Sequence, residues 1–191
     1  MELHPLIVLD SAVEEFRRHL VVVGDEDWTA ATPCTDWDVH YLVAHVVGGN
    51  RFASMVLDGR SAAEAMAVVM GTSQLGASPL ADFDDSAASQ RDGFGRAGAL
   101  EAGVNHPVGE MSGQRFLGMR VFDVAVHGWD LATALGREVT LDDDLLTHVL
   151  HTISSEAPGF GIEPCGDIDP EASPLERLLD LSGRRAGDAR S

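Results

Sequence analysis

The sequence predicts a mainly α-helical protein whose long helices pack against one another as an antiparallel bundle. Three observations support this fold class. Apolar residues recur at three- and four-residue spacing through several long segments, as in amphipathic helices. Short stretches containing glycine or proline separate these segments. Few segments show the pattern of a β-strand, so helix packed on helix is the natural architecture.

The chain begins with two long predicted helices. Five apolar residues recur at helical spacing in residues 5–23, namely Leu6, Leu9, Val13, Phe16 and Leu20. Gly24 follows this segment and ends the first helix. We expect Thr35 to cap the second helix, with Asp38 three residues later as the partner in a short capping box. The second helix then continues to about Leu57.

Three further segments lie in the middle of the chain. Residues 61–71, SAAEAMAVVMG, predict a short extra helix. Residues from about 80 to 101 predict a third long helix, which is rich in alanine and weakly amphipathic. Pro107 and three glycines interrupt the helical pattern over residues 102–113, so we expect an extended connection there.

The last third of the chain contains two more predicted helices and a tail. One helix runs from about Gln114 to Leu135. The next spans about 141–156 and opens with three aspartates, which favour the positive end of the helix dipole. The tail from about residue 157 is rich in glycine, proline and aspartate, and we expect it to be docked or flexible. Within it, the segment ASPLERLLDLSGR contains one apolar turn that could dock.

Length and composition indicate an ordinary globular domain without disulfides. The 191 residues predict a single domain over 1–191, with a core large enough to fold without disulfides. Cys34 and Cys165 lie far apart and form no zinc-type spacing, so each is interpreted as a small reduced side chain. No apolar run is long enough to span a membrane, and the first ten residues lack the features of a signal peptide. We therefore expect a cytoplasmic protein.

The charge of the chain excludes two classes of partner. The formal net charge is −18, and every one of the thirteen cationic residues is arginine. A surface this acidic repels nucleic-acid phosphates and anionic membranes, so we expect neither as a partner.

Acid and histidine residues at a spacing of four are common in this chain. Four of the eight histidines have an acid four residues earlier: Glu15–His19, Asp36–His40, Asp123–His127 and Asp144–His148. Glu15 and His19 lie in EEFRRH, which predicts a charged helix surface. The pairs at residues 36 and 144 lie at predicted helix starts, where acids have a capping role. Only Asp123 and His127 lie in apolar sequence, within FDVAVHGWDLA.

His45 lies in a second apolar segment, LVAHVVGG, on a different long helix. Buried imidazoles and carboxylates require partners, and a divalent metal ion bound by His45, Asp123 and His127 would supply one. Two histidines and one carboxylate suit Zn²⁺ with an open position, and also Fe²⁺, Ni²⁺ or Mn²⁺. The alternative is a hydrogen-bonded polar network in the core without metal, in which Asp123 only orients His127.

The sequence resembles the metal-binding domain of mycothiol-dependent maleylpyruvate isomerases and the wider DinB-like four-helix bundles. The matching segments are TPCTDWDVHYLVAHVVGG, VNHPVGEMSG, RVFDVAVHGWDLATALG and ASPLERLLDLSGR, in the order found in the family. The resemblance implies a DinB-like antiparallel four-helix bundle that binds a divalent metal, usually zinc, through His45, Asp123 and His127. It also implies mycothiol as a cosubstrate and is compatible with a homodimer.

The sequence departs from the isomerase pattern in two ways. The isomerases typically have glutamate where this chain has Asp123, whose carboxylate lies about one methylene closer to the backbone. The complete isomerases also carry a C-terminal α/β domain that helps to shape the active site. Only about 35 residues follow the last long predicted helix here, too few for such a domain.

These observations lead to two functional hypotheses. In the first, a metal-activated small-molecule thiol attacks a small electrophile, as in an isomerase or an S-transferase. Arg115 and Arg120 could then receive an anionic substrate group, although both could equally be solvated surface residues. Asp130 could hydrogen-bond to His127 or pair with an arginine. In the second hypothesis, the bundle binds a metal or ligand without catalysis.

Two further expectations concern the residues around this set. Trp37 and Trp129 are expected to pack the bundle rather than to contact substrate. If no cation is present, removing the Asp123 carboxylate should relieve a desolvation cost, so that Asp123→Ala destabilises the metal-free protein less than it weakens metal binding.

Overall fold

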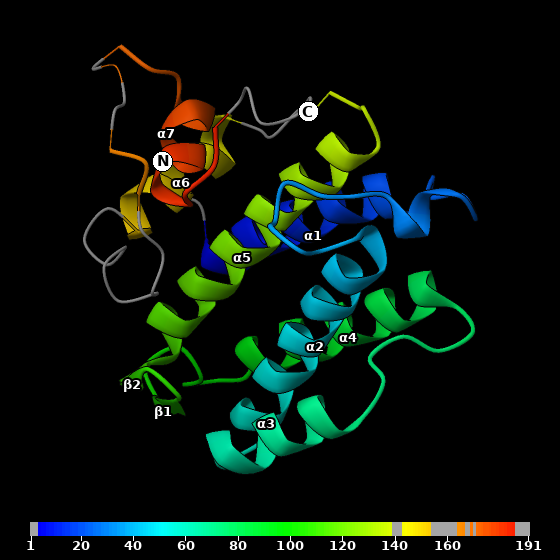
Figure 1. Cartoon of the computed structure of the whole chain (residues 1–191). Helices are drawn as coiled ribbons and strands as arrows, with labels where there is room; N and C mark the ends of the chain where they lie inside the picture. Colours follow the sequence, from blue (N-terminus) through cyan, green and yellow to red (C-terminus); the bar gives the residue numbers. More distant parts are fainter. Residues whose placement is uncertain (1–3, 139–142, 154–163, 167–168, 170, 186–191) are drawn as a thin grey trace.

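Four long helices form the body of the protein. A computed structural model describes residues 4–138, 143–153, 164–166, 169 and 171–185. Helix α1 (Pro5–Leu20) packs against α5 (Gly113–Ala134), and α2 (Val39–Leu57) packs against α4 (Pro79–Phe94). Contacts between α1 and α4 and between α2 and α5 join the two pairs into one bundle (Figure 1). The predicted mainly helical bundle is confirmed.

The core lies where these four helices meet. Phe16 of α1 stacks on Phe83 of α4, with their ring centroids 4.9 Å apart. Helix α2 contributes six apolar side chains that are completely buried: Val39, Leu42, Val43, Val46, Val47 and Ala53. Helix α5 is buried over most of its length because apolar residues occur on every side of it. Polar residues within α5 are consequently carried into the interior.

The loop before α2 folds back on itself and sets the start of that helix. Asp38 is the N-cap, and its carboxylate accepts a hydrogen bond of 2.7 Å from the backbone N–H of Tyr41. The prediction that Thr35 caps this helix is therefore wrong. Residues 30–38 instead form a compact turn, in which Thr32 N–H donates to the Trp37 carbonyl and Asp36 has a positive φ of 65°. The turn places Cys34 and Trp37 beside α5.

Helix α4 ends earlier than the sequence predicts. It stops at Phe94, seven residues before the expected position 101, and the chain turns through residues 95–102. Gly98 has a positive φ of 78°, which an L-amino acid with a side chain rarely adopts. The backbone at Gly98 is thus not helical, and the chain turns before the predicted end of this helix.

Two smaller elements flank one end of α2. Helix α3 (Ala62–Gly71) begins with a reciprocal capping box between Ser61 and Glu64. The predicted extended connection is a hairpin of two short antiparallel strands, β1 (Gly103–His106) and β2 (Gly109–Ser112). These elements lie near each other at the lower end of the bundle in Figure 1.

The C-terminal part of the chain docks onto the bundle. Helix α6 (Asp143–Ile153) contacts both α5 and α7 (Pro174–Leu181). Helix α7 corresponds to the predicted apolar turn, and its Leu178 and Leu179 are buried. Docking of this turn is confirmed, whereas residues 154–163, which include the predicted end of α6 and the first part of the tail, lie outside the described residues.

The Glu15–His19 pair is buried, contrary to the expected charged surface. His19 is completely buried and lies 3.0 Å from a Glu15 carboxylate oxygen. The reason is helical spacing, since His19 is three residues after the core residue Phe16 and next to the core residue Leu20. Its side chain therefore faces the bundle rather than solvent.

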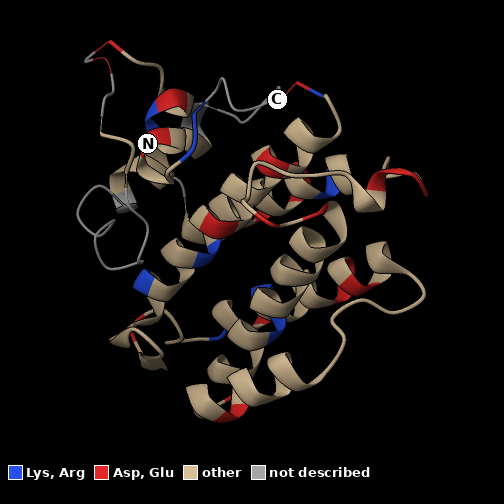
Figure 2. Cartoon of the chain, viewed as in Figure 1, with Lys and Arg blue, Asp and Glu red and all other residues tan. Residues whose placement is uncertain are grey.

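Acidic positions occur on many elements of the molecule, whereas basic positions are fewer (Figure 2). Over the part of the chain that the structure describes, every helix is too short or too polar to cross a bilayer.

Candidate metal centre

The three predicted ligands meet between α2 and α5. His45 Nε2 lies 3.3 Å from Asp123 Oδ1, and His127 Nε2 lies 3.6 Å from the same oxygen. The two imidazole rings contact edge to face, with centroids 4.9 Å apart. One donor atom from each residue lies within 4.8 Å of the other two. The residues that the sequence selected from two distant segments therefore form one cluster.

The spacing and chemistry of these donors fit a divalent cation. Nitrogen and oxygen ligands about 2.0–2.1 Å from a tetrahedral zinc ion lie about 3.3–3.5 Å from one another. The two distances to Asp123 Oδ1 are close to this range. His45 and Asp123 are partly exposed, with 37% and 25% of their side chains accessible, whereas His127 is 9% exposed. The cluster could hold a metal ion with one side open to a ligand.

Asp130 orients the deepest of the three residues. Its Oδ2 lies 2.8 Å from His127 Nδ1, so the carboxylate accepts the Nδ1–H and leaves Nε2 directed at Asp123. Asp130 is completely buried and also forms an ion pair with Arg184, whose Nε donates to Oδ1 over 2.7 Å. A carboxylate that holds the far nitrogen of a histidine is a common feature of metal sites.

Cys34 and Arg184 complete a second cluster around Asp130. The Cys34 thiol donates to Asp130 Oδ2 over 3.2 Å, and Arg184 Nη2 donates to Cys34 Sγ over 3.1 Å. Cys34 Sγ also lies 3.9 Å from His127 Nδ1. Cys34, His127 and Asp130 form a second group with suitable donor spacing for a metal. Sequence reasoning did not find this group, because a lone cysteine and a distant tail arginine carry no spacing signal.

Arg120 is buried beside the centre instead of lying at the surface. Its Nη1 donates to Asp123 Oδ2 over 2.9 Å, and its Nη2 donates to Asn50 Oδ1 over 2.9 Å. Its Nε donates to Gln90 Oε1 over 3.3 Å. The interpretation of Arg120 as a solvated residue is wrong, and its three nitrogens are already engaged by protein groups. Arg115, which lies five residues earlier on α5, is not among the residues that line the pocket beside the centre.

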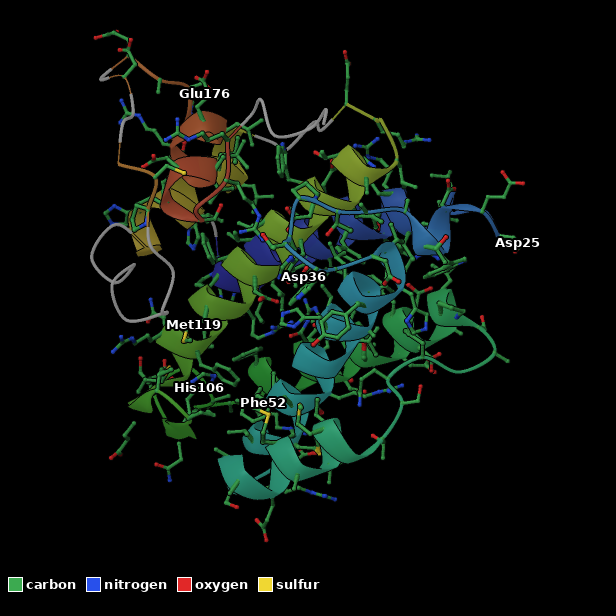
Figure 3. All side chains as sticks on the ribbon, viewed as in Figure 1. Asp25, Asp36, Phe52, His106, Met119 and Glu176 are labelled. Atoms are coloured by element: carbon green, nitrogen blue, oxygen red, sulfur yellow. The ribbon has the colours of Figure 1, made fainter. Side chains whose placement is uncertain are left out.

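Both tryptophans pack the bundle, as expected. Trp129 is buried, and Trp37 is partly buried against the core. Trp37 also covers the candidate ligands, since its ring stacks on His127 at a centroid distance of 5.5 Å and lies 4.8 Å from His45. The loop that carries Trp37, labelled at Asp36 in Figure 3, runs beside α5 and forms one wall of the centre.

The charges of the centre reinforce one another. Burial alone would raise the pKa of Asp123, but Arg120 and the two imidazoles outweigh it and hold that pKa well below its usual range. Burial alone would lower the pKa of His127, but Asp123 and Asp130 hold it well above its usual range. His127 is thus held between two carboxylates, which favour positive charge at this position.

A pocket of about 590 Å³ opens onto His45 and Asp123. Its walls come from α2, α3, α5 and the β1–β2 hairpin. Figure 3 labels three of its lining residues, Phe52, His106 and Met119, which belong to three different elements. The volume is typical of a site for a small molecule. A ligand in this pocket would lie directly beside the candidate metal ligands.

Comparison with known proteins identifies the family. Residues 9–132 match the model of the mycothiol maleylpyruvate isomerase N-terminal domain. Two uncharacterized proteins from strains of Mycobacterium tuberculosis are 32% identical over 187 residues, covering 94% of this chain and 97% of theirs.

Two solved structures share the fold. These are mycothiol-dependent maleylpyruvate isomerase, with a TM-score of 0.55, and a histidine-to-alanine variant of it, with a TM-score of 0.61. Both are 17% identical to this chain, and each match covers 75% of this chain but 65% of the isomerase. The matched region thus leaves part of each isomerase without a counterpart. By sequence and by fold, the chain belongs to the mycothiol maleylpyruvate isomerase N-terminal domain family.

Proposed function

We propose that His45, Asp123 and His127 bind one divalent metal ion and that the protein uses it for thiol chemistry on a small electrophile. Zinc is the first choice, with nickel, iron and manganese as alternatives, because two imidazoles and a carboxylate suit all four ions. Mycothiol is the proposed thiol because the family model and the solved relatives carry its name. The convergence of three donors from α2 and α5 at one open pocket carries this proposal.

The surrounding residues have defined roles in this proposal. A bound divalent ion would stabilise the thiolate form of an entering thiol. Asp130 fixes His127 in the tautomer whose Nε2 can bind metal, and Arg120 holds the second oxygen of Asp123. Trp37 covers one side of both imidazoles and keeps water from that side. The pocket would hold the electrophile next to His45 and Asp123.

Metal analysis tests the site directly. Untagged protein should retain about one divalent ion per chain after supplementation and desalting, and His45→Ala should lose it. His40→Ala is the matched control, since His40 lies on the same helix but is exposed and outside the candidate cluster. Wild-type protein without stoichiometric metal, or equal metal in His45→Ala and wild type, would contradict the proposal.

A turnover assay separates the enzyme from a binding protein. Metal-loaded protein should consume a panel of small electrophiles in the presence of mycothiol, and His127→Ala should abolish this activity. Retained metal without turnover of any electrophile would favour the second hypothesis, a metal- or ligand-binding bundle without catalysis. The cytoplasmic location and the homodimer stay predictions.

A further inference from the structure

Apart from a metal ion at the candidate centre, the described lining of the pocket beside it offers little to attract an anion. Among the described residues that line it, Arg120 is the one arginine. Each of its three guanidinium nitrogens already donates to a protein oxygen, on Gln90, Asp123 and Asn50. A carboxylate substrate would have to compete with Asp123 for this cation.

Packing against α2 and hydrogen bonds to α2 and α4 hold the Arg120 guanidinium in place. The guanidinium lies directly against Gly49, where an added Cβ would overlap with Nη1. The arginine side chain is 8% exposed and is enclosed by polar partners on α2 and α4. Gly49 therefore makes room for a fixed, structural cation.

His106, the imidazole of the pocket lining that lies outside the candidate centre, does not add positive charge to the pocket. His106 packs against the rings of Phe52 and Phe116, at centroid distances of 5.6 and 5.4 Å. Burial lowers the pKa of His106, and the nearby Arg120 lowers it further, so this imidazole is neutral at pH 7. The net charge of −18 on the whole chain also disfavours an approaching anion.

Apolar side chains form most of the pocket. Helix α3 contributes Met66, Val69 and Met70, and α5 contributes Met119 and Phe122. Methionine side chains adapt to apolar ligands of different shape. His45, Asp123 and Arg120 of the lining belong to the candidate centre, and Gln74 and His106 are further polar residues of the lining.

We propose that this pocket takes uncharged, largely apolar small molecules, and not a carboxylate such as a pyruvate derivative. An uncharged ligand can bury its surface against α3 and the rings of Phe52, His106 and Phe116 without leaving a charge unpaired. The charge preference of the pocket does not depend on the proposed function. Only the reaction of the bound ligand rests on it, because the reactive group of the ligand would lie at the end of the pocket near His45. It separates the substrate of this chain from the compound named in its structural relatives.

A matched pair of fluorescent probes tests the charge preference. N-phenyl-1-naphthylamine and 1-anilinonaphthalene-8-sulfonate share one skeleton and differ by a sulfonate. In titrations of the full chain, with chelator present, we expect the uncharged probe to bind at least about tenfold more tightly, because the sulfonate would be desolvated without a free cation. Equal binding, tighter binding of the sulfonate, or no binding of the uncharged probe would overturn the inference.

Two arginine substitutions on α3 locate the binding. Met66→Arg adds a cation to the pocket wall and should reduce the preference for the uncharged probe by about tenfold, since it supplies the missing partner for a sulfonate. Val68→Arg adds the same charge to the same helix outside this pocket and should leave the preference unchanged. If both variants behave alike, the probes bind elsewhere and the inference fails.

The titration requires neither metal nor thiol, so its result is independent of the proposed function. Protein that binds metal but prefers the sulfonate would contradict only the substrate class. Protein that binds the uncharged probe but no metal would contradict only the metal chemistry.

Discussion

Replacing Asp123 with alanine should destabilise the protein even when no metal is bound. Arg120 is 8% exposed and donates to Asp123 over 2.9 Å, so the variant would leave a buried guanidinium with only the neutral amides of Asn50 and Gln90. Removing one partner of a fully buried ion pair costs about 3–5 kcal/mol. Asp123 is 25% exposed. Because water in the pocket can partly replace its carboxylate, we expect a loss of about 2–3 kcal/mol.

This prediction corrects the premise of the one made from sequence. The sequence suggested that a metal-free Asp123 is an unpaired buried carboxylate whose removal relieves a desolvation cost. The structure shows that Arg120 supplies the missing cation. The premise was wrong because the sequence analysis assigned Arg120 either to a substrate group or to the solvated surface and did not pair it with Asp123.

Thermal unfolding in the presence of chelator measures the shift in melting temperature, and urea unfolding under the same conditions measures the free energy. Asp123→Ala should lower the melting temperature by about 4–12 °C for a chain of this length. Combined with Arg120→Gln, it should lose less than the sum of the two single effects, with a coupling of at least about 1 kcal/mol. Asp10→Ala is the control, because the Asp10–Arg91 pair is 45% exposed on both sides and its loss should cost under about 1 kcal/mol. If Asp123→Ala is as stable as wild type or as Asp10→Ala, the reasoning is refuted.

Three other predictions concern single side chains. Asp130→Asn should weaken metal binding by about 10–100-fold while all three ligands remain, because it weakens the contact that orients His127; unchanged affinity in a competition titration would contradict this. Gly49→Ala should lower the free energy of unfolding by about 1–3 kcal/mol, since the new methyl group displaces the Arg120 guanidinium; an unchanged denaturant midpoint would contradict it. Burial lowers the pKa of His19 in the folded protein below 6.5, its value in the unfolded chain. The neutral imidazole therefore costs no stability above that pH, and stability is lost as the pH falls because the unfolded chain takes up a proton first. His19→Gln should therefore show a flatter decline in unfolding free energy between about pH 7 and pH 5 than wild type, and parallel pH profiles would contradict this assignment.

The helices and the three candidate ligands were predictable because each has a local signal. Apolar spacing defines α2 and α5, and the placement of His45 and Asp123 among apolar neighbours indicates that they face the interior. Two helices of a bundle that both bury polar residues bring those residues together. This explains why context identified the cluster when acid–histidine spacing alone did not.

The surroundings of the ligands were not predictable because they depend on contacts between distant segments. Arg184 contacts Cys34 across 150 positions of sequence, and neither residue belongs to a periodic pattern. Arg120 pairs with Asp123 within one helix, yet its burial depends on Asn50 of α2 and Gln90 of α4. His19 is similar, since its position on the α1 face, and not the charge of its neighbours, decides its burial.

The two candidate donor groups share His127, and Arg184 distinguishes between them. A cation held by Cys34, His127 and Asp130 would lie close to a guanidinium that already contacts both Cys34 and Asp130. Two unit charges 4 Å apart near a protein surface repel by about 4 kcal/mol, and a divalent ion doubles this. In the group formed by His45, Asp123 and His127, Arg120 donates to the second oxygen of Asp123, and the group opens onto the pocket. If the proposed metal ion binds, Arg184, which follows α7, would direct it toward the pocket side of His127. The C-terminal segment would then have a role in a centre otherwise built by the bundle.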